Sequence, residues 1–278
     1  MISWRLLIQC PDRSGLVHLL TGVLFRRGCN VLVNHEFADT EAGRFFMRTE
    51  FIGAIDPGEV VEECRTLLPA DAVVGLAKPG RARVVVLASR EHHCLADLLI
   101  RHEFGELAAD VLAVISNHSD LGVFVQRSGV PFLHCCHEGL ERDEHERRLL
   151  GLLAPLRPDY IVLAKYMRVL SAAFVARYSG RIINIHHSFL PAFVGAKAYH
   201  QAFARGVKVI GATAHFVTNE LDAGPIITQE LLPVDHTHSP QDLARAGQDV
   251  ERLALAKALR LVFEDRVFLN GNRTVIFD

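Results

Sequence analysis

Features that mark secreted, membrane-spanning or nucleic-acid-binding proteins are scarce in this sequence. Its six cysteines include no Cys-x-x-Cys pair, and 30 Lys and Arg are balanced by 32 Asp and Glu. No apolar run approaches the roughly 20 residues of a membrane span, and no signal-peptide core follows the first methionine. We therefore expect reduced thiols, a cytoplasmic protein, and neither nucleic acid nor membrane as a partner.

The composition is otherwise that of a folded protein with two domains. Half of the 278 residues are hydrophobic, which is enough for two separate cores. The segment 78–81, Lys-Pro-Gly-Arg, combines chain-breaking and charged residues, which is typical of a short exposed joint. We place the two domains at residues 1–79 and 80–278.

The pattern of the first domain predicts a ferredoxin-like sandwich. Alternation of apolar and polar residues predicts strands, and apolar positions at helical spacing predict two helices between them. The expected strands are 4–9, 30–38, 43–51 and 72–77, and the expected helices begin near residue 16 and at about 57. Their order, βαββαβ, is that of the ferredoxin-like fold.

Beyond the joint, the pattern indicates an α/β domain with a mainly parallel, Rossmann-like sheet. Continuous apolar runs are typical of strands buried on both faces, and helical patterns alternate with them. The runs are 83–88, 111–116, 160–164 and 182–185, with helices at about 94–101, 119–128, 143–154 and 170–178. Later strands near 209–217 and 225–233 and a long helix at about 239–262 complete the domain.

Polar residues that could carry chemistry gather at one strand end and in one loop. Asn184 and His186 end the last of the apolar runs, and strand alternation places them on one face. An amide and an imidazole together can stabilise a negatively charged oxygen. Glu220 and Asp222 lie in a loop with Gly and Pro, where a carboxylate could orient a water. The residues alone leave equally open that these groups are only packed or solvated.

Separated motifs in the second domain resemble the folate-dependent formyltransferase family. Asn-Ile-His at 184–186, Ser-Phe-Leu-Pro at 188–191 and the run from His215 to Ile226 occur in that family's order. The resemblance spans about 83–270. It implies a catalytic triplet of Asn184, His186 and Asp222.

The resemblance also implies a role for each member of the triplet. The Asn184 amide and a protonated His186 would stabilise charge on the formyl oxygen. Asp222 would hold and deprotonate the attacking water and keep His186 charged. His215 would support Asp222, or it would simply be a packed strand residue.

A segment at 163–170 resembles the family's folate cleft, which receives the pterin ring. The substrate-binding residues that this likeness implies are Met167, Arg168, Val169, Leu170, His215, Thr218 and Glu220. Folate is then the substrate, with no further cofactor and no metal. The His and Cys clusters at 92–94 and 134–137 are too crowded for a zinc site.

Other parts of the sequence bear on the acceptor of the formyl group. Family members that act on a ribonucleotide carry a Gly-rich phosphate loop, which Ser-Arg-Glu-His-His-Cys at 89–94 lacks. Cys-Pro-Asp-Arg-Ser-Gly-Leu at 10–16 resembles the ACT domain of members that use water. This implies hydrolysis of 10-formyltetrahydrofolate to formate and tetrahydrofolate, which supplies formate for purine biosynthesis and balances one-carbon pools. Transfer to an amine acceptor and a non-catalytic folate or amino-acid sensor remain the alternatives.

The resemblance to an ACT domain implies regulation. Such domains commonly pair edge to edge and bind amino acids, so methionine and glycine are implied as effectors, and a homo-oligomer (dimer or tetramer) is expected. Backbone N–H groups where the first helix begins could hold a carboxylate. The expected regulatory residues are Asp12, Ser14, Gly15, Leu16, Asn30 and Asn34. A domain that only holds two copies together is the alternative.

Overall fold

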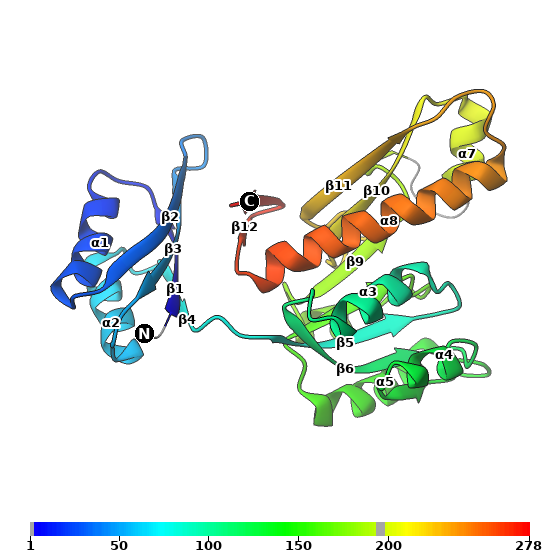
Figure 1. The fold of residues 1–278 in the computed structure, drawn as a ribbon, viewed down its shortest axis with the longest axis horizontal. Helices are drawn as coiled ribbons and strands as arrows, with labels where there is room; N and C mark the ends of the chain where they lie inside the picture. The colour runs from blue at the N-terminus through cyan, green and yellow to red at the C-terminus, as the bar shows by residue number, and fades with distance from the viewer. Residues whose placement is uncertain (1–2, 193–197) are drawn as a thin grey trace. The chain divides into compact units, whose positions relative to one another are not determined.

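The computed structural model describes residues 3–192 and 198–278 and divides into two compact units (Figure 1). The first unit comprises Met1–Gly80, Glu264–Asn270 and Thr274–Asp278, and the second comprises Arg81–Phe263 and Gly271–Arg273. The expected joint lies at this boundary. The C-terminal residues differ from the expected division, because most of them pack with the first unit and do not complete the second.

The first unit contains four antiparallel strands and two helices in the predicted order βαββαβ. The elements are β1 (Ser3–Pro11), α1 (Leu16–Arg26), β2 (Asn30–Asp39), β3 (Arg44–Ile52), α2 (Pro57–Leu67) and β4 (Val73–Ala77). The strands lie in the order β2-β3-β1-β4. Alternate residues of β1 are buried in one core with residues of α1 and α2, as the period of a strand requires: Trp4, Leu6, Ile8 and Cys10.

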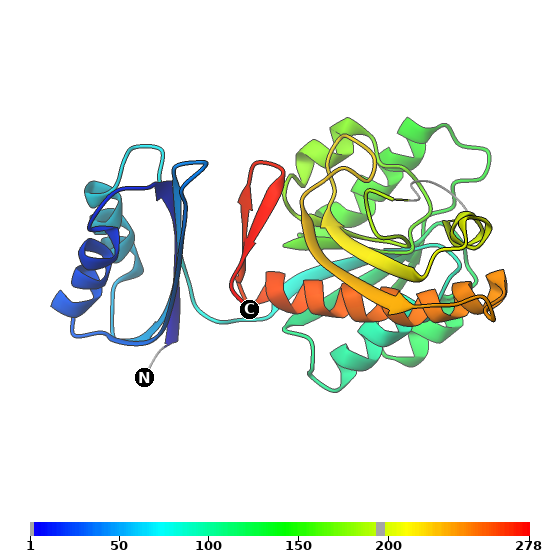
Figure 2. The same ribbon diagram turned by 90° about the horizontal axis from the view of Figure 1, so that it is seen from above.

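A C-terminal hairpin lies on the face of this sheet opposite to α1 and α2 (Figures 1 and 2). It consists of β12 (Val267–Asn270) and β13 (Arg273–Ile276), which the sequence analysis did not predict. The Phe268 ring packs edge-on against Phe46 of β3, with ring centroids 5.8 Å apart. The sheet is therefore covered on both faces, and the last residues of the chain complete its first unit.

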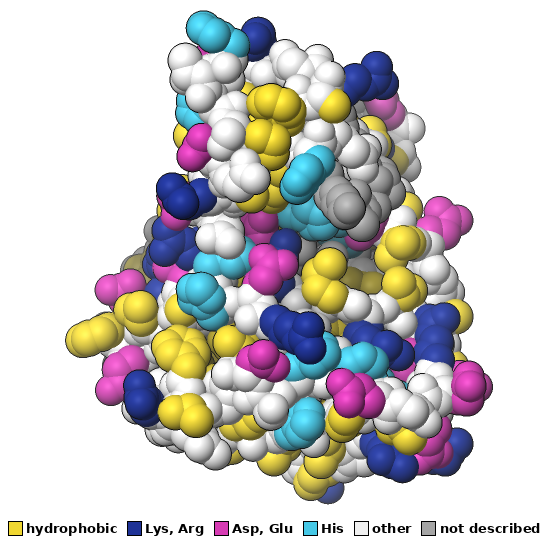
Figure 3. Space-filling view, turned by 90° about the vertical axis from the view of Figure 1, so that its right-hand side faces the viewer, with side chains coloured by type: hydrophobic (Ala, Val, Ile, Leu, Met, Phe, Trp, Pro, Cys, Tyr) yellow, Lys and Arg dark blue, Asp and Glu magenta, His cyan; other side chains and the backbone are white. Residues whose placement is uncertain are grey.

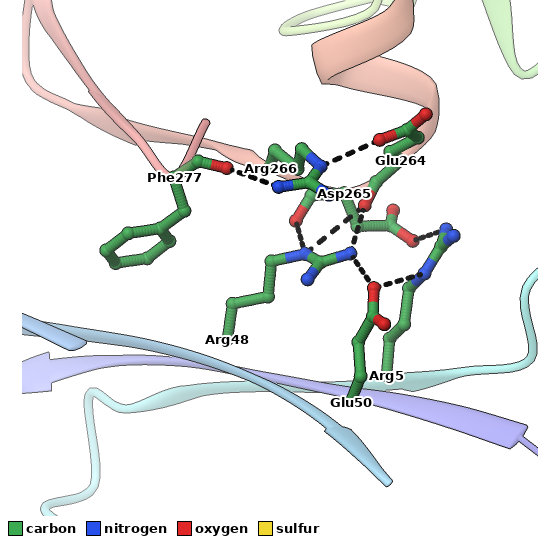
Figure 4. A network of polar contacts seen from close by, with 7 residues as sticks. All are labelled: Arg5, Arg48, Glu50, Glu264, Asp265, Arg266 and Phe277. Atoms are coloured by element: carbon green, nitrogen blue, oxygen red, sulfur yellow. Dashed lines mark hydrogen bonds and ion pairs between the residues drawn. The ribbon is translucent and has the colours of Figure 1, made fainter. Parts of the chain in front are cut away.

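A buried arginine ties the C-terminal segment to the sheet (Figure 4). Arg48 of β3 is fully buried. Its Nε donates to Asp265 O at 2.9 Å, and its Nη2 donates to Glu264 O at 2.8 Å. The same Nη2 donates to Glu50 Oε1 at 2.5 Å. Because Glu264 and Asp265 belong to no helix or strand, the guanidinium satisfies carbonyl groups that would otherwise lack partners.

We expect Arg48→Met to lower the free energy of unfolding by about 2–3 kcal/mol. Methionine fills similar space but leaves the two carbonyl groups and Glu50 without their donor. Urea denaturation followed by circular dichroism measures the change. Arg65→Met, at an exposed arginine of the same unit, is the matched control and should stay within about 0.5 kcal/mol of the parent. Equal losses in both variants would contradict the role given to Arg48.

The second unit is a three-layer α/β domain built on a seven-stranded sheet. Its elements are β5 (Ala82–Ala88), α3 (His93–Glu103), β6 (Ala109–Ser116), α4 (Gly122–Arg127), β7 (Phe132–His134), α5 (Arg142–Leu156), β8 (Tyr160–Ala164), α6 (Ala172–Arg177), β9 (Ile182–His186), α7 (Ala198–Arg205), β10 (Val209–Phe216), β11 (Ile226–Pro233) and α8 (Pro240–Phe263). None of the described helices is long and apolar enough to span a membrane.

The strand order of this sheet creates a site for ligands. The order is β11-β10-β9-β8-β5-β6-β7, in which β5 to β9 run parallel, β10 runs antiparallel to β9, and β11 runs antiparallel to β10. The chain moves from β5 outward to β6 and then returns to β8 on the other side of β5. In open α/β sheets, such a reversal opens a crevice at the carboxyl ends of the strands. Four polar residues follow those ends directly: Ser89, Asn117, Lys165 and His187.

Candidate active site

A pocket of about 280 Å³ opens where β8 and β9 end. Its wall comes from the segment after β8, from β9 and from the loop between β10 and β11. It is lined by every residue expected in the catalytic triplet and the folate cleft: Asn184, His186, Asp222, Met167, Arg168, Val169, Leu170, His215, Thr218 and Glu220. The fold thus brings these separated segments to one place.

His186 and Asp222 form a largely buried pair in the pocket wall. His186 Nδ1 lies 3.2 Å from Asp222 Oδ1, and the two side chains are 7 % and 10 % exposed. The other ring nitrogen, His186 Nε2, is buried and has no hydrogen-bond partner among the described residues. Because Asp222 accepts from Nδ1, Nε2 is the ring nitrogen left to meet a substrate.

Asn184 is oriented by the neighbouring strand. β9 and β10 pair with Asn184 opposite His215, and Asn184 Nδ2 lies 3.2 Å from His215 Nε2. His215 Nδ1 donates to Phe216 O at 3.0 Å. Burial lowers the pKa of His215, so its neutral ring keeps the Nδ1 proton and accepts from Asn184 at Nε2. Of the two N–H groups of the Asn184 amide, one is used here and the other is left for a ligand.

The loop that carries Asp222 has an unusual backbone. Asp222 has a φ of 54°, in the left-handed region that residues other than glycine seldom occupy. A Cβ on Gly224 would lie 1.8 Å from Phe216 O, so only glycine fits against β10 there. Burial alone would raise the pKa of Asp222, but the His186 hydrogen bond and the nearby imidazoles hold that pKa below its usual value. Asp222 is therefore ionised at neutral pH.

The segment after β8 that is expected to form the folate cleft is anchored at both ends. Met167 N donates to Ser89 Oγ at 3.0 Å, and Ser171 N donates to Glu146 Oε1 at 2.7 Å. Between these anchors the apolar side chains of Met167 and Val169 are 59 % and 57 % exposed. Exposed apolar side chains in a pocket wall favour a ligand with a flat apolar part.

Known proteins resemble the chain over most of its length. A formyl transferase family model matches residues 82–259. The formyltetrahydrofolate deformylase of Escherichia coli is 49 % identical over 96 % of this chain and 95 % of its own length. The chain belongs to the formyltetrahydrofolate deformylase family.

Solved structures of two kinds of enzyme are similar to this chain. The crystal structure of a formyltetrahydrofolate deformylase from Pseudomonas syringae pv. tomato covers 100 % of this chain and 95 % of that chain, with a TM-score of 0.96 and 41 % identity. The structure of glycinamide ribonucleotide transformylase 1 from Symbiobacterium toebii covers 71 % of this chain and 95 % of that chain, with a TM-score of 0.68 and 36 % identity. More than a quarter of this chain thus has no counterpart in that transformylase.

Two basic residues of the pocket wall received no role from the sequence analysis. Lys165 and His187 line the pocket directly after β8 and β9. The His187 ring stacks on His186 with centroids 5.0 Å apart. Burial, Lys165 and His186 lower the pKa of His187 to about 4. Their position immediately after buried strands was the signal available in the sequence.

We expect the His187 imidazole to titrate near pH 4, because burial and neighbouring positive charge disfavour its protonated form. The unfolded state, with a histidine pKa of about 6.5, binds the proton more strongly. The stability that neutral His187 contributes is therefore fully present above about pH 6.5 and is lost as pH falls toward about 4. NMR titration of the ring protons, assigned with His187→Gln, measures the midpoint. A midpoint near 6.5 would contradict this prediction.

The residues expected at the regulatory site lie at two ends of the first unit's sheet. The loop 12–15 follows Pro11, the last residue of β1. Asn30 pairs with Ile52, which pairs with Ser3, the first residue of β1. Within a single chain, Asn30 and the loop 12–15 therefore lie at opposite ends of the sheet, which corrects the expectation of a single continuous site. The reason is that α1 carries the chain back along the whole sheet before β2 begins.

The start of α1 also differs in detail from the expected site. Gly15 is the N-cap residue, with a φ of 86° and no side-chain cap hydrogen bond, so neither Asp12 nor Ser14 caps the helix. Leu16 is 2 % exposed and packs into the core of the unit. Asn34, in the middle of β2, accepts a hydrogen bond from Thr49 Oγ1 at 2.5 Å.

Proposed function

We propose that the chain hydrolyses 10-formyltetrahydrofolate to formate and tetrahydrofolate, with water as the formyl acceptor. The observation that carries this proposal is the Asp222–His186 pair beside Asn184 in one pocket. Relatives named formyltetrahydrofolate deformylase match nearly the whole chain, which supports the same reaction. The role in supplying formate for purine biosynthesis belongs to this proposal, and the cytoplasmic location stays a prediction.

In the proposed mechanism, Asp222 prepares the water for attack. Its carboxylate holds the water and takes one proton as the bond from oxygen to the formyl carbon forms. The lowered pKa of Asp222 keeps it ionised but makes it a modest base, so positioning of the water is a large part of its contribution. The same carboxylate stabilises a positive charge on His186, 3.2 Å away.

Asn184 and His186 act on the charge that develops on the formyl oxygen. The free N–H of the Asn184 amide and the Nε2–H of protonated His186 donate to that oxygen, and loss of one such donor commonly lowers kcat by about 100- to 1000-fold. When the bond between the formyl carbon and the folate nitrogen breaks, His186 gives its Nε2 proton to that nitrogen. The proton taken by Asp222 then restores His186, and formic acid ionises to formate.

The remaining pocket residues bind the folate in this proposal. The anchored segment Met167–Leu170 receives the pterin ring, which its exposed apolar side chains support. Thr218 and Glu220 supply polar groups from the loop before Asp222. His215 contributes by holding the Asn184 amide, as their 3.2 Å contact indicates.

The proposal predicts that the purified chain releases formate and tetrahydrofolate in equal amounts from 10-formyltetrahydrofolate with no amine present. Formate is measured with a coupled dehydrogenase and tetrahydrofolate by liquid chromatography. Product that forms only when an amine is added would overturn hydrolysis and support transfer. Binding of the folate without turnover under either condition would support a sensor.

Formyl transfer to an amine is the second candidate, because the transformylase from Symbiobacterium toebii shares the fold at 36 % identity. We expect a small amine as the acceptor, because a formal net charge of −2 gives the chain no basic excess for a nucleic acid. On the face drawn in Figure 3, the described Lys and Arg side chains are interspersed with Asp and Glu. Nucleic acid is bound mainly through broad basic surfaces.

We further propose that the first unit is an ACT-type regulatory domain that pairs with a second copy along β2. This strand is at the edge of the sheet. Four of its apolar side chains are 36–52 % exposed: Val31, Leu32, Val33 and Phe37. An exposed apolar edge strand is a ready template for pairing with another strand.

Such pairing would also reunite the expected effector site. Asp39, at the end of β2, and Pro11, at the end of β1, both pair with Arg44 of β3, so they lie at the same end of the sheet. In an antiparallel pair of β2 strands, Asn30 of the partner subunit would lie near this end, beside the loop 12–15. Sedimentation of Leu32→Glu tests the pairing, and rates with methionine or glycine test the effectors. A parent chain that sediments as a monomer, or rates that neither amino acid changes, would contradict the respective part.

A further inference from the structure

A buried carboxylate lies next to the pocket, outside the mechanism described above. Glu251 of α8 is 1 % exposed. Its Oε2 lies 2.8 Å from His93 Nε2 and 3.1 Å from Lys165 Nζ. Its Oε1 accepts a hydrogen bond from the Tyr199 hydroxyl at 2.7 Å. Burial raises the pKa of Glu251, but these three partners bring it down to about 2, so the carboxylate is charged at neutral pH.

The cluster around Glu251 is assembled from four separate segments of the chain. His93 begins α3, Lys165 follows β8, Tyr199 lies in α7 and Glu251 in α8. A Cβ on Gly247, one turn before Glu251, would lie 2.0 Å from the Tyr199 hydroxyl oxygen. The absence of a side chain at position 247 therefore leaves room for the Tyr199 hydroxyl to reach the Glu251 carboxylate. Both carboxylate oxygens are occupied, which is what a buried charge requires.

An ion pair explains this cluster better than a metal site. Ligand atoms of His93, Cys94 and Glu251 do lie within 4.8 Å of one another. Burial and the Glu251 carboxylate, however, raise the pKa of the Cys94 thiol far above its ordinary value. Zinc binds the thiolate form of cysteine. The Lys165 ammonium already supplies the positive charge that Glu251 needs.

Only one member of the ion pair belongs to the pocket wall. Lys165 lines the pocket together with the catalytic triplet, whereas Glu251 is not among the described residues that line it. Lys165 is 5 % exposed and has a φ of 61°, in the left-handed region. The Lys165 ammonium also lies 3.9 Å from Glu91 Oε2, and Glu91, like Glu251, is not among the described residues that line the pocket. The positive charge of Lys165 nevertheless acts on the pocket wall, because it contributes to the lowered pKa of His187 there.

We propose that the Lys165 ammonium, fixed by Glu251, is a specificity-determining group that keeps protonated amines from the formyl carbon and leaves water as the acceptor. Simple amines are cations at neutral pH. A fixed cation in a wall shielded from solvent repels them, whereas neutral water is not repelled. This inference rests on the hydrolysis proposed above.

The excluded reaction can be written out for methylamine. The amine nitrogen would bond to the formyl carbon, and the bond from that carbon to the folate nitrogen would break. Methylammonium would give up two protons, one to the folate nitrogen and one to solvent, to yield N-methylformamide and tetrahydrofolate. Hydroxylamine, which is largely uncharged at neutral pH, would yield formohydroxamate by the same bond changes.

The test measures how each enzyme divides the formyl group between water and an added nucleophile. Mass spectrometry gives the ratio of N-methylformamide, or of formohydroxamate, to formate. In Lys165→Gln, which keeps a donor for Glu251 but loses the charge, we expect the methylamine ratio to rise at least about tenfold. The hydroxylamine ratio should change less than about threefold, and Lys165→Arg, which keeps the charge, should retain both parent ratios.

Two outcomes would overturn the role of Lys165. One is a methylamine ratio that stays at the parent value in Lys165→Gln, and the other is an equal rise for both nucleophiles, which would indicate size and not charge. The ratio is internal to one sample, so it does not depend on the fraction of folded enzyme, and Lys165→Met provides a second neutral variant. A parent enzyme that releases no formate would instead contradict the proposed hydrolysis.

Discussion

Replacing Asp222 with asparagine is expected to lower kcat for formate release by about 100- to 10,000-fold. Asparagine has nearly the same size but takes no proton from water. It also removes the negative charge that lies 3.2 Å from His186 Nδ1 and stabilises the protonated ring. Initial rates of formate release at saturating 10-formyltetrahydrofolate measure the effect.

The matched control for this variant is Asp249→Asn, at an exposed position of α8. That change removes one carboxylate outside the pocket wall and should leave kcat within about twofold of the parent. KM for the folate should change little in Asp222→Asn, because the segment proposed to bind the folate is anchored through Ser89 and Glu146. A fall in kcat of less than tenfold would refute the role of Asp222 in preparing the water.

Replacing His186 with alanine is expected to lower kcat by about 1000-fold or more. The variant loses the Nε2 donor to the formyl oxygen and also the proton source for the leaving nitrogen. The same assay of formate release measures it. His200→Ala, at an exposed histidine of α7, should retain the parent rate. Equal losses in the two variants would show that the effect is not specific to the pocket.

The double variant of Asp222 and His186 separates joint action from independent action. In the proposed mechanism the pair works as one unit, because Asp222 both holds the water and keeps His186 charged. The double variant should therefore be little slower than the slower single variant. Rate losses that multiply would indicate that the two residues contribute independently, in spite of their 3.2 Å contact.

Hydrophobic periodicity predicted the longer elements of both units well. The strand expected at 160–164 is β8 (Tyr160–Ala164), and the helix expected at about 239–262 is α8 (Pro240–Phe263). These elements are predictable because a strand or helix with one buried face repeats its apolar residues at a fixed local period. β7 was missed because its three residues are too few to show a period.

Contacts between distant segments account for the features that were missed. The C-terminal segment packs on the first unit through contacts of Arg48 and Phe268. No local residue pattern near position 264 predicts that the chain packs against the N-terminal sheet again. The regulatory residues were grouped because they are close in sequence to one helix and one strand. The register of β1, β3 and β2 instead separates Asn30 from the loop 12–15.

By itself, the sequence determined the βαββαβ and alternating α/β organisation, and it placed Asn184 and His186 on one face of a strand, because period and order are local properties of a chain. Only the tertiary structure decided that Asp222 meets His186, that Lys165 in the pocket wall is paired with Glu251, and that the chain ends on its first unit. Each of these contacts joins residues far apart in sequence. Their approach depends on how the intervening elements pack, which no residue pattern within a single segment specifies.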